Sequence, residues 1–218
     1  MIAITVTGLD PRRDRRYVDI LFLACKGGSG AVRGCDGYDH IGLINTAGGL
    51  LAQDYEMFEM TTPHRLRRHE YLADSAGAGR WRGGLGVETE FEIDGEQVTG
   101  ISFGDGVDDE ARAFGLFGGY PGALNRLELR TPAGETIAPK SKDVVAIPRG
   151  SVFYQQAGGG GGFEDPFERP VALVADDVRD GLISIDAARR EYGVVVDPTN
   201  LRVDETRTTA LRASRGSP

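Results

Sequence analysis

Apolar and polar residues alternate most regularly at residues 87–93. In this run, VETEFEI, valine, threonine, phenylalanine and isoleucine alternate with three glutamates. A period of two is typical of a β-strand with one buried face and one face in water. A short polar turn follows, and the run VTGISF at 98–103 leads back. The two segments together predict a β-hairpin.

Other runs of apolar and β-branched residues predict further strands. They indicate a buried strand at 17–23, a strand with one wet face at 64–72, a hairpin at 125–139 that turns at 132–134, and two strands within 143–156 around a turn at 148–150. The segments 24–49 and 74–86 are rich in glycine and predict long loops. The middle of the chain is therefore predicted to be antiparallel β-structure.

The pattern changes to a helical one near the C-terminus. Pro170 is placed as a first helical residue and Gly181 as a stop signal. Ser184 is a typical N-cap, and Gly193 lies just past the end of the helix that follows. A short strand is predicted at 193–197, and the tail after it begins as a helix that frays.

These elements predict an α+β fold, with a mainly antiparallel β body, long glycine-rich loops and a small helical C-terminal lobe. We expect the β-rich body at residues 1–165 and the helical lobe with its tail at 166–218. The two parts are expected to form one structural unit.

Charge and hydropathy exclude several classes of protein. The 218 residues carry a net charge of −8 and show no basic face, which argues against a nucleic-acid partner. No apolar run is long enough to span a bilayer, so no membrane association is predicted. At the N-terminus the charges follow the apolar residues, the reverse of a signal peptide, and the predicted location is the cytoplasm.

Glycine is the unusual residue, with 32 positions gathered in clusters. Five are consecutive: Gly158, Gly159, Gly160, Gly161 and Gly162. A phosphate-binding loop is rejected, because Phe163 and two acidic residues follow where a lysine and a hydroxyl would be needed. The remaining interpretations are close backbone packing, where a Cβ would clash, and a flexible linker between body and lobe.

Candidate catalytic residues are few. The trio Asp36, Asp39 and His40 is a weak candidate for a metal or substrate site. The alternative is that these loop carboxylates bind local backbone N–H groups. His64 and His69 are five residues apart on a predicted strand and should point to opposite faces, so they are poor co-ligands.

An acidic loop and the two cysteines each have a structural interpretation and a functional one. The acidic loop at 104–115 lacks the residue order of a calcium loop, so we expect a solvated loop. Cys25 and Cys35 are expected to be reduced cysteines, because no CxxC pair or second ligand cluster accompanies a redox or metal role. No metal site is therefore predicted in this chain.

The loop at 74–86 holds a tryptophan between two arginines, Arg80, Trp81 and Arg82. One interpretation is a buried ring with both arginines bonded to carbonyl or carboxylate oxygens, which together form a structural anchor. The other is an exposed loop tip.

Four motifs in one order resemble the C-terminal part of the hydantoinase B/oxoprolinase family. They are DSAGAGRWRGGLGVETEFEI at 74–93, GDGVDDEARAFGLFGGYPGALN from 104, GGGGGFEDPFER at 158–169 and VRDGLISIDAARREYGVVVD at 178–197. Members of this family include B subunits of ATP-dependent hydantoinases and the corresponding subunits of acetone and acetophenone carboxylases. The resemblance covers nearly the whole chain, but family members are usually much longer, and the part not matched here is the N-terminal one.

The resemblance implies a non-autonomous subunit of an ATP-dependent cyclic-amide hydrolase or ketone carboxylase. It implies two partners: a hydantoinase A-type ATPase subunit and a chain that supplies the N-terminal part of the B subunit. No cofactor is expected on this chain, while ATP and a divalent metal are expected on the partner subunits. The alternatives are a purely structural assembly subunit and a free-standing enzyme that uses His40 with Asp36 and Asp39. The sequence does not separate hydrolase from carboxylase.

The resemblance also suggests a role for the five glycines at 158–162. We expect them to lie against the partner B chain near the active site. Asp165 and Arg169 are expected to fix the exit of this loop through a mutual ion pair, with the neighbouring prolines stiffening it.

Overall fold

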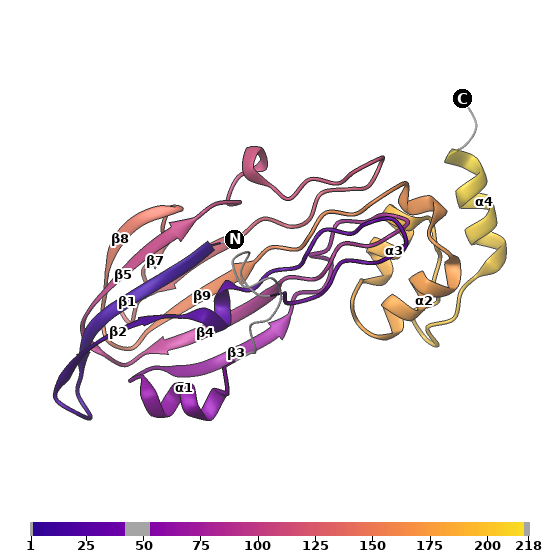
Figure 1. Cartoon of the computed structure of the whole chain (residues 1–218). Helices are drawn as coiled ribbons and strands as arrows, with labels where there is room; N and C mark the ends of the chain where they lie inside the picture. The colour runs from indigo at the N-terminus through magenta and orange to yellow at the C-terminus, as the bar shows by residue number, and fades with distance from the viewer. Residues whose placement is uncertain (1, 42–52, 216–218) are drawn as a thin grey trace.

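Two antiparallel β-sheets form the body of the computed structural model, which describes residues 2–41 and 53–215 (Figure 1). The first sheet has the order β2-β1-β5-β8, with β2 at Arg15–Ile20, β1 at Ile2–Asp10, β5 at Glu96–Gly104 and β8 at Lys142–Ile147. The second has the order β3-β4-β9-β6-β7, with β3 at Arg65–Tyr71, β4 at Val87–Ile93, β9 at Ser151–Ala157, β6 at Arg126–Arg130 and β7 at Thr136–Ile137. With the C-terminal helices described below, they confirm the α+β class.

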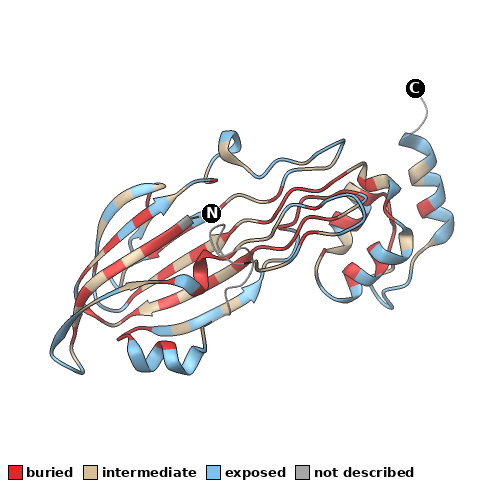
Figure 2. Ribbon diagram, in the orientation of Figure 1, coloured by how far each residue is buried: buried red, intermediate tan, exposed pale blue. Residues whose placement is uncertain are grey.

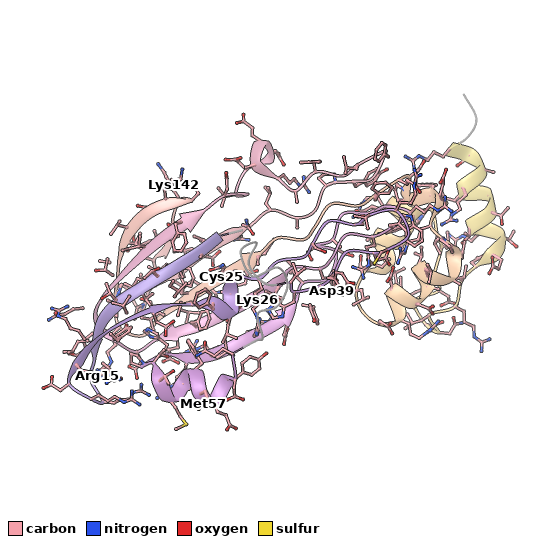
Figure 3. The ribbon with its side chains drawn as sticks, viewed as in Figure 1. Arg15, Cys25, Lys26, Asp39, Met57 and Lys142 are labelled. Atoms are coloured by element: carbon pink, nitrogen blue, oxygen red, sulfur yellow. The ribbon has the colours of Figure 1, made fainter. Side chains whose placement is uncertain are left out.

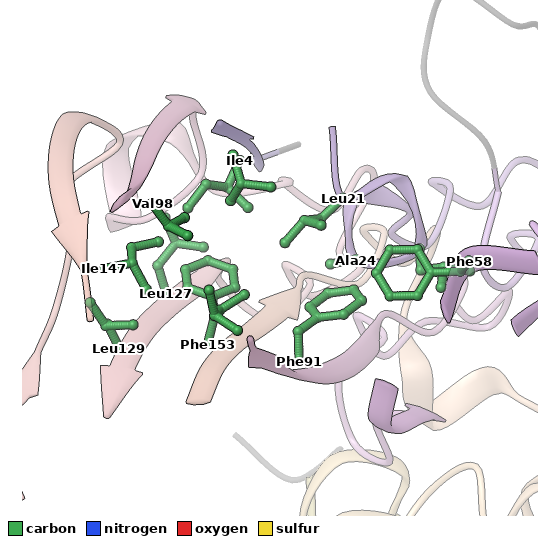
Figure 4. Packing of buried hydrophobic residues seen from close by; sticks show 13 residues of the cluster. Ile4, Leu21, Ala24, Phe58, Phe91, Val98, Leu127, Leu129, Ile147 and Phe153 are labelled. Carbon is green, nitrogen blue, oxygen red and sulfur yellow. The ribbon is translucent and has the colours of Figure 1, made fainter. Parts of the chain in front are cut away.

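The main hydrophobic core lies between the two sheets. Ile4 and Val98 project from the first sheet, and Phe91, Leu129 and Phe153 project from the second (Figure 4). All five are buried, as the alternating pattern of their strands requires. This layer of side chains makes the β body a two-sheet sandwich.

For the hairpin predicted from 87–93 and 98–103, the two strands are confirmed but their pairing is wrong. Both strands exist, but β4 pairs with β3 and β9, whereas β5 pairs with β1 and β8 in the other sheet. The turn between them therefore crosses from one sheet to the other. Period-two alternation gives each strand one buried face, and two facing strands in a sandwich satisfy it as well as two paired neighbours do.

The other strand predictions have similar outcomes. The hairpin at 125–139 is confirmed, because Leu129 pairs with Ile137 across the turn. The two strands in 143–156 are also present as β8 and β9, in different sheets. The predicted strand at 17–23 ends at Ile20, and the 3-10 helix η1 at Phe22–Cys25 follows.

Two N-terminal elements were not predicted. The first is the strand β1, which lies in the middle of its sheet. The second is the helix α1 at Tyr55–Thr61, where the Asp54 side chain accepts a hydrogen bond from the Met57 N–H. The predicted loop at 24–49 lies outside the described residues from 42 onward.

Between the sheets and the C-terminal helices runs a set of extended segments that are not β-strands (Figure 1). We call them the glycine bundle and define it by the residues 27–38, 75–86, 113–123 and 158–163. Burial continues from the sandwich along the segments 75–86 and 158–163, whereas 27–38 and 113–123 are largely exposed or half-buried (Figure 2). The 3-10 helix η3 at Asp109–Ala111 precedes one of them, and η4 at Pro166–Glu168 follows another.

The C-terminal helices have a second cluster of buried apolar side chains. They are α2 at Val171–Arg179, α3 at Ile185–Tyr192 and α4 at Glu205–Arg215. Val174, Ala188 and Tyr192 lie in this cluster together with Ala78 of the glycine bundle. The boundary at residue 165/166 stays a prediction, since the bundle contributes to the core of the lobe.

The ends of these helices largely follow the sequence signals. The Ser184 hydroxyl accepts a hydrogen bond from the Ala187 N–H, and Gly193 has a left-handed φ of 65°. Pro170 is the N-cap of α2 rather than its first residue. The predicted strand at 193–197 is reduced to a single bridge between Val196 and Val203.

Candidate functional site

The five glycines at 158–162 run through the middle of the glycine bundle. Their peptide groups bond to three neighbouring segments of the same chain, through Gly28 N to Gly158 O at 3.1 Å, Gly77 N to Gly160 O at 2.8 Å, Gly160 N to Gly84 O at 2.9 Å and Leu116 N to Gly162 O at 3.0 Å. Peptide groups that cannot pair within their own segment are thereby satisfied by neighbours. The bundle is held together by its backbone.

Glycine is required at these positions by the spacing of the segments. A Cβ on Gly160 would lie 1.8 Å from the carbonyl oxygen of Ser29, and one on Gly161 would lie 1.9 Å from that of Phe114. These neighbours are backbone atoms, which cannot move aside without displacing a whole segment. Close backbone packing is thus what the glycines do, and the contacts are made within the chain. A contact of the same glycines with a partner chain stays a prediction.

A buried cluster of charges joins the glycine bundle to the helical lobe. The side chain of Arg169, which is 2% exposed, donates to both oxygens of Asp36 at 2.8 Å and to Asp177 of α2 at 2.9 Å. Arg82 is also buried and lies 3.4 Å from Asp39 and 3.5 Å from Asp177. Burial disfavours the charge of Arg169, but the bonds to Asp36 and the charge of Asp177 outweigh it and raise its pKa.

Asp36 and Asp39 are therefore engaged in structure. Besides the arginines, Asp36 accepts a hydrogen bond from the Arg82 N–H at 2.7 Å, and Asp39 accepts one from the Leu85 N–H at 2.6 Å. The two carboxylates do bind backbone N–H groups, but these lie 46 positions along the chain and not in the same loop, as the interpretation expected. A catalytic role for the two carboxylates is not tested by this geometry and stays a prediction.

The predicted ion pair between Asp165 and Arg169 is wrong. Asp165 caps η4 by accepting from the Phe167 N–H, and its carboxylate lies 3.2 Å from Arg215 of α4. Arg169 points instead into the buried cluster with Asp177. The physical reason is that a buried guanidinium needs its charge compensated and its N–H donors bonded, and the cluster provides two carboxylates and the Arg80 carbonyl for this.

The three residues at 80–82 differ in how far they are buried. Arg80 is exposed and lies within 3.7 Å of Glu164 and 3.5 Å of Glu168. Trp81 is half-buried, and its backbone pairs with that of Phe163 at the end of the glycine run. Of the three residues, Arg82 is the buried one, and both arginines are paired with carboxylates.

A histidine pair that the sequence reasoning missed lies where the sandwich meets the glycine bundle. The ring centroids of His40 and His69 are 5.0 Å apart, and the Tyr55 hydroxyl is 2.9 Å from Nδ1 of His69. Burial, and then the charges of His69 and Lys26, lower the pKa of His40 to about 4. Figure 3 places Lys26 near the end of the β body, at this junction. His40 has a left-handed φ of 46°, which no sequence signal disclosed.

His64 lies apart from this pair, but the predicted reason, opposite faces of one strand, is wrong. The strand β3 begins only at Arg65, and a β-bulge between Leu66 and Arg68 places His69 opposite Thr89, on the same face as Leu66 opposite Phe91. The His64 ring packs edge-on against Tyr17 at 5.2 Å, and burial lowers its pKa to about 4. In the acidic loop, Asp108 caps η3 and Asp109 pairs with Arg112. In the described ranges, no group of three or more histidine, cysteine, aspartate or glutamate side chains is arranged to hold a metal ion. The prediction that metal and ATP bind elsewhere in an assembly is not tested by this.

Two other predictions concern the cysteines and membrane association. Both cysteines are free in the structure, with Cys25 buried and Cys35 exposed. Over residues 2–41 and 53–215, no helix has the length and apolar character that crossing a membrane would require.

Comparison with known proteins gives consistent matches. The profile of the family Hydantoinase B/oxoprolinase matches residues 1–166. Over 97% of its length the chain is 36% identical to caprolactamase subunit beta of Pseudomonas jessenii and spans 37% of that protein.

Solved structures agree with the sequence matches. Nucleotide-free acetone carboxylase is similar with a TM-score of 0.86 and 25% identity, over 99% of this chain and 32% of that one. The ATP-dependent caprolactamase of Pseudomonas jessenii is similar with a TM-score of 0.80 and 31% identity, over 96% and 37%. The chain thus spans about a third of the length of the relatives it matches.

Proposed function

The chain belongs to the hydantoinase B/oxoprolinase family, and from this premise we propose that it serves as the C-terminal part of a B-type subunit. The assembly it completes is an ATP-dependent, multi-subunit enzyme that opens a cyclic amide or carboxylates a ketone. In this proposal the chain is not active alone, and the assembly works in the cytoplasm, where ATP is available.

One observation carries the proposal. The similarity in fold extends over 99% of the chain, so it includes the sandwich, the glycine bundle and the helical lobe together. Two solved relatives that share this fold are named as ATP-dependent, one for acetone carboxylation and one as a caprolactamase. A complete module retained in two such enzymes supports a contribution to what they have in common rather than to one substrate.

The proposed partners follow from the same premise. A hydantoinase A-type subunit binds ATP, and a chain with the rest of the B-type sequence carries the divalent metal and much of the substrate site. Within this scheme the glycine run 158–162 belongs to a rigid segment that reaches from the sandwich to the lobe. Such a segment can hold both ends of the module in fixed positions relative to a partner.

A second candidate function is a structural assembly subunit that contributes no reacting group. It is favoured by the contacts of Asp36 and Asp39, whose oxygens are bonded to Arg169, Arg82 and backbone N–H groups. A carboxylate held in this way has to break an ion pair before it could act as a base.

The test is to isolate the tagged chain from its own cells and to identify the proteins that remain bound. The isolated assembly is then assayed for ATP hydrolysis that depends on added caprolactam, hydantoin or acetone. We expect an A-type and a B-type chain and substrate-dependent ATP hydrolysis. Turnover of a substrate by this chain alone and without ATP would overturn the proposal.

A further inference from the structure

The outer face of the four-stranded sheet is formed by uncharged side chains. On this face two rows run straight across all four strands, one of Val18, Thr7, Thr99 and Ala146, the other of Ile20, Thr5, Ile101 and Val144. We call these eight residues the neutral face. None of the eight side chains is charged. They are the side chains that alternate with the buried ones of the core.

Several of these side chains are well exposed. Val18 is 72% exposed and Val144 is 66% exposed, at opposite edges of the sheet. Ile101 lies between Thr5 and Val144 and is also exposed, as is Phe103 at the end of the same strand. Charged residues occur at the border, where Lys142 lies opposite Phe103 (Figure 3).

The outer face of the five-stranded sheet has the opposite character. It carries a lattice of cross-strand and neighbouring ion pairs: Arg67 with Glu92 at 3.0 Å, Arg68 with Glu88 at 3.1 Å, Arg126 with Glu128 at 2.6 Å, and Arg130 with Glu90 at 2.5 Å and with Glu128 at 3.1 Å. This is the polar outer face expected of an antiparallel sheet in water. The same sandwich therefore presents one charged face and one neutral face.

We infer that the neutral face is the surface on which another polypeptide docks. Contiguous exposed apolar side chains mark interaction sites in soluble proteins, and the charged face of the same sandwich is the internal comparison. Threonine, valine and isoleucine also give a flat surface with little rotamer freedom, so little entropy is lost when a partner covers it.

The occupant is the remainder of a B-type chain, an inference that rests on the proposed function. The relatives with this fold are about three times as long as this chain, since it spans 32% and 37% of them. About two thirds of each relative is therefore polypeptide outside this module, and it is the available occupant for the neutral face. An uncharged face needs an apolar partner surface, because an unpaired charge opposite it would be desolvated at a cost.

The test compares two substitutions on opposite faces in the tagged chain isolated from its own cells. The double variant Ile101→Lys, Val144→Lys places two charges in the neutral face. Val152→Lys is the matched control, because Val152 lies on the charged face between Glu92 and Arg130, where charged side chains are already present. Val18→Lys, at the far edge of the neutral face, is a second variant. Thermal unfolding of each purified chain shows that it is folded.

We expect the B-type chain, identified by mass spectrometry, to be captured at least about tenfold less by the double variant than by the unchanged chain. Val152→Lys is expected to capture it as the unchanged chain does. Equal capture by all variants would overturn this inference and leave the proposed function intact. If the unchanged chain captures no B-type chain, the proposed function fails as well. A dimer of this chain that the double variant dissociates would assign the face to a second copy instead.

Discussion

Arg169 and Asp177 form a buried ion pair, with Nη2 2.9 Å from the carboxylate oxygen, at the point where the glycine bundle meets α2. The same guanidinium is bonded through two nitrogens to Asp36, which lies 133 positions earlier in the sequence. One side chain thus joins the end of η4, the second half of α2 and a loop 133 positions earlier. This contact is one of the links between the helical lobe and the bundle.

Replacing Arg169 by methionine should destabilise the protein strongly. Asp36 and Asp177 would be left as partly or wholly buried carboxylates without this partner, a loss of about 3–5 kcal/mol in the free energy of unfolding. Arg179→Met is the matched control, because its pair with Asp176 on the same helix is exposed and should contribute at most about 1 kcal/mol. Urea unfolding measures both, and equal losses would contradict the account of the cluster.

Within the glycine bundle, Gly160→Ala should be poorly tolerated. The added Cβ would meet the Ser29 carbonyl, and the backbone shift should cost about 1–3 kcal/mol or more of the free energy of unfolding. Gly30→Ala is the control in the same bundle, because the nearest atom to its Cβ would be 3.9 Å away. Its effect should stay within about 0.5 kcal/mol. A tolerated Gly160→Ala in thermal unfolding would favour the flexible-linker interpretation.

Stability should fall as the pH is lowered from 6.5 toward 4. Burial lowers the pKa of His64 from 6.5 to about 4, so in this window the unfolded chain binds more protons than the folded one. A single histidine of this kind accounts for on the order of 3 kcal/mol across the window. The ring packs against Tyr17, so His64→Phe should keep the contact and reduce the dependence, while His40, with the same lowered pKa, retains its own contribution. Urea unfolding at several pH values measures it, and an unchanged slope would be the contrary result.

The carboxylates of the bundle should matter for stability and not for chemistry. Asp36→Asn weakens the bonds to Arg169 and should lower the free energy of unfolding by roughly 1–3 kcal/mol. Substrate-dependent ATP hydrolysis per assembled complex should be unchanged. A large drop in that rate, with assembly intact, would instead make Asp36 part of the reacting site.

The sequence predicts the features that depend on neighbouring residues, and it does not predict those that depend on residues far apart in the sequence. The caps of α3 and the turn of the β6/β7 hairpin are local, and Ser184 and Gly134 mark them correctly. The partition of strands between two sheets is not local, because Phe91 and Val98 alternate in the same way whichever strand lies beside them. The partners of Arg169 lie 8 and 133 positions away, and no spacing rule reports them. The His40–His69 pair depends on a left-handed φ at a non-glycine residue, which composition does not reveal.

The central claim is that this chain completes a B-type subunit, and an add-back titration tests it most directly. The assembly is prepared without this chain, and the purified chain is then added in steps while substrate-dependent ATP hydrolysis is measured. The account predicts a rate that rises with added chain and saturates at a fixed ratio of this chain to the B-type chain. A rate that is already maximal without the chain, and that does not change as the chain is added, would contradict it.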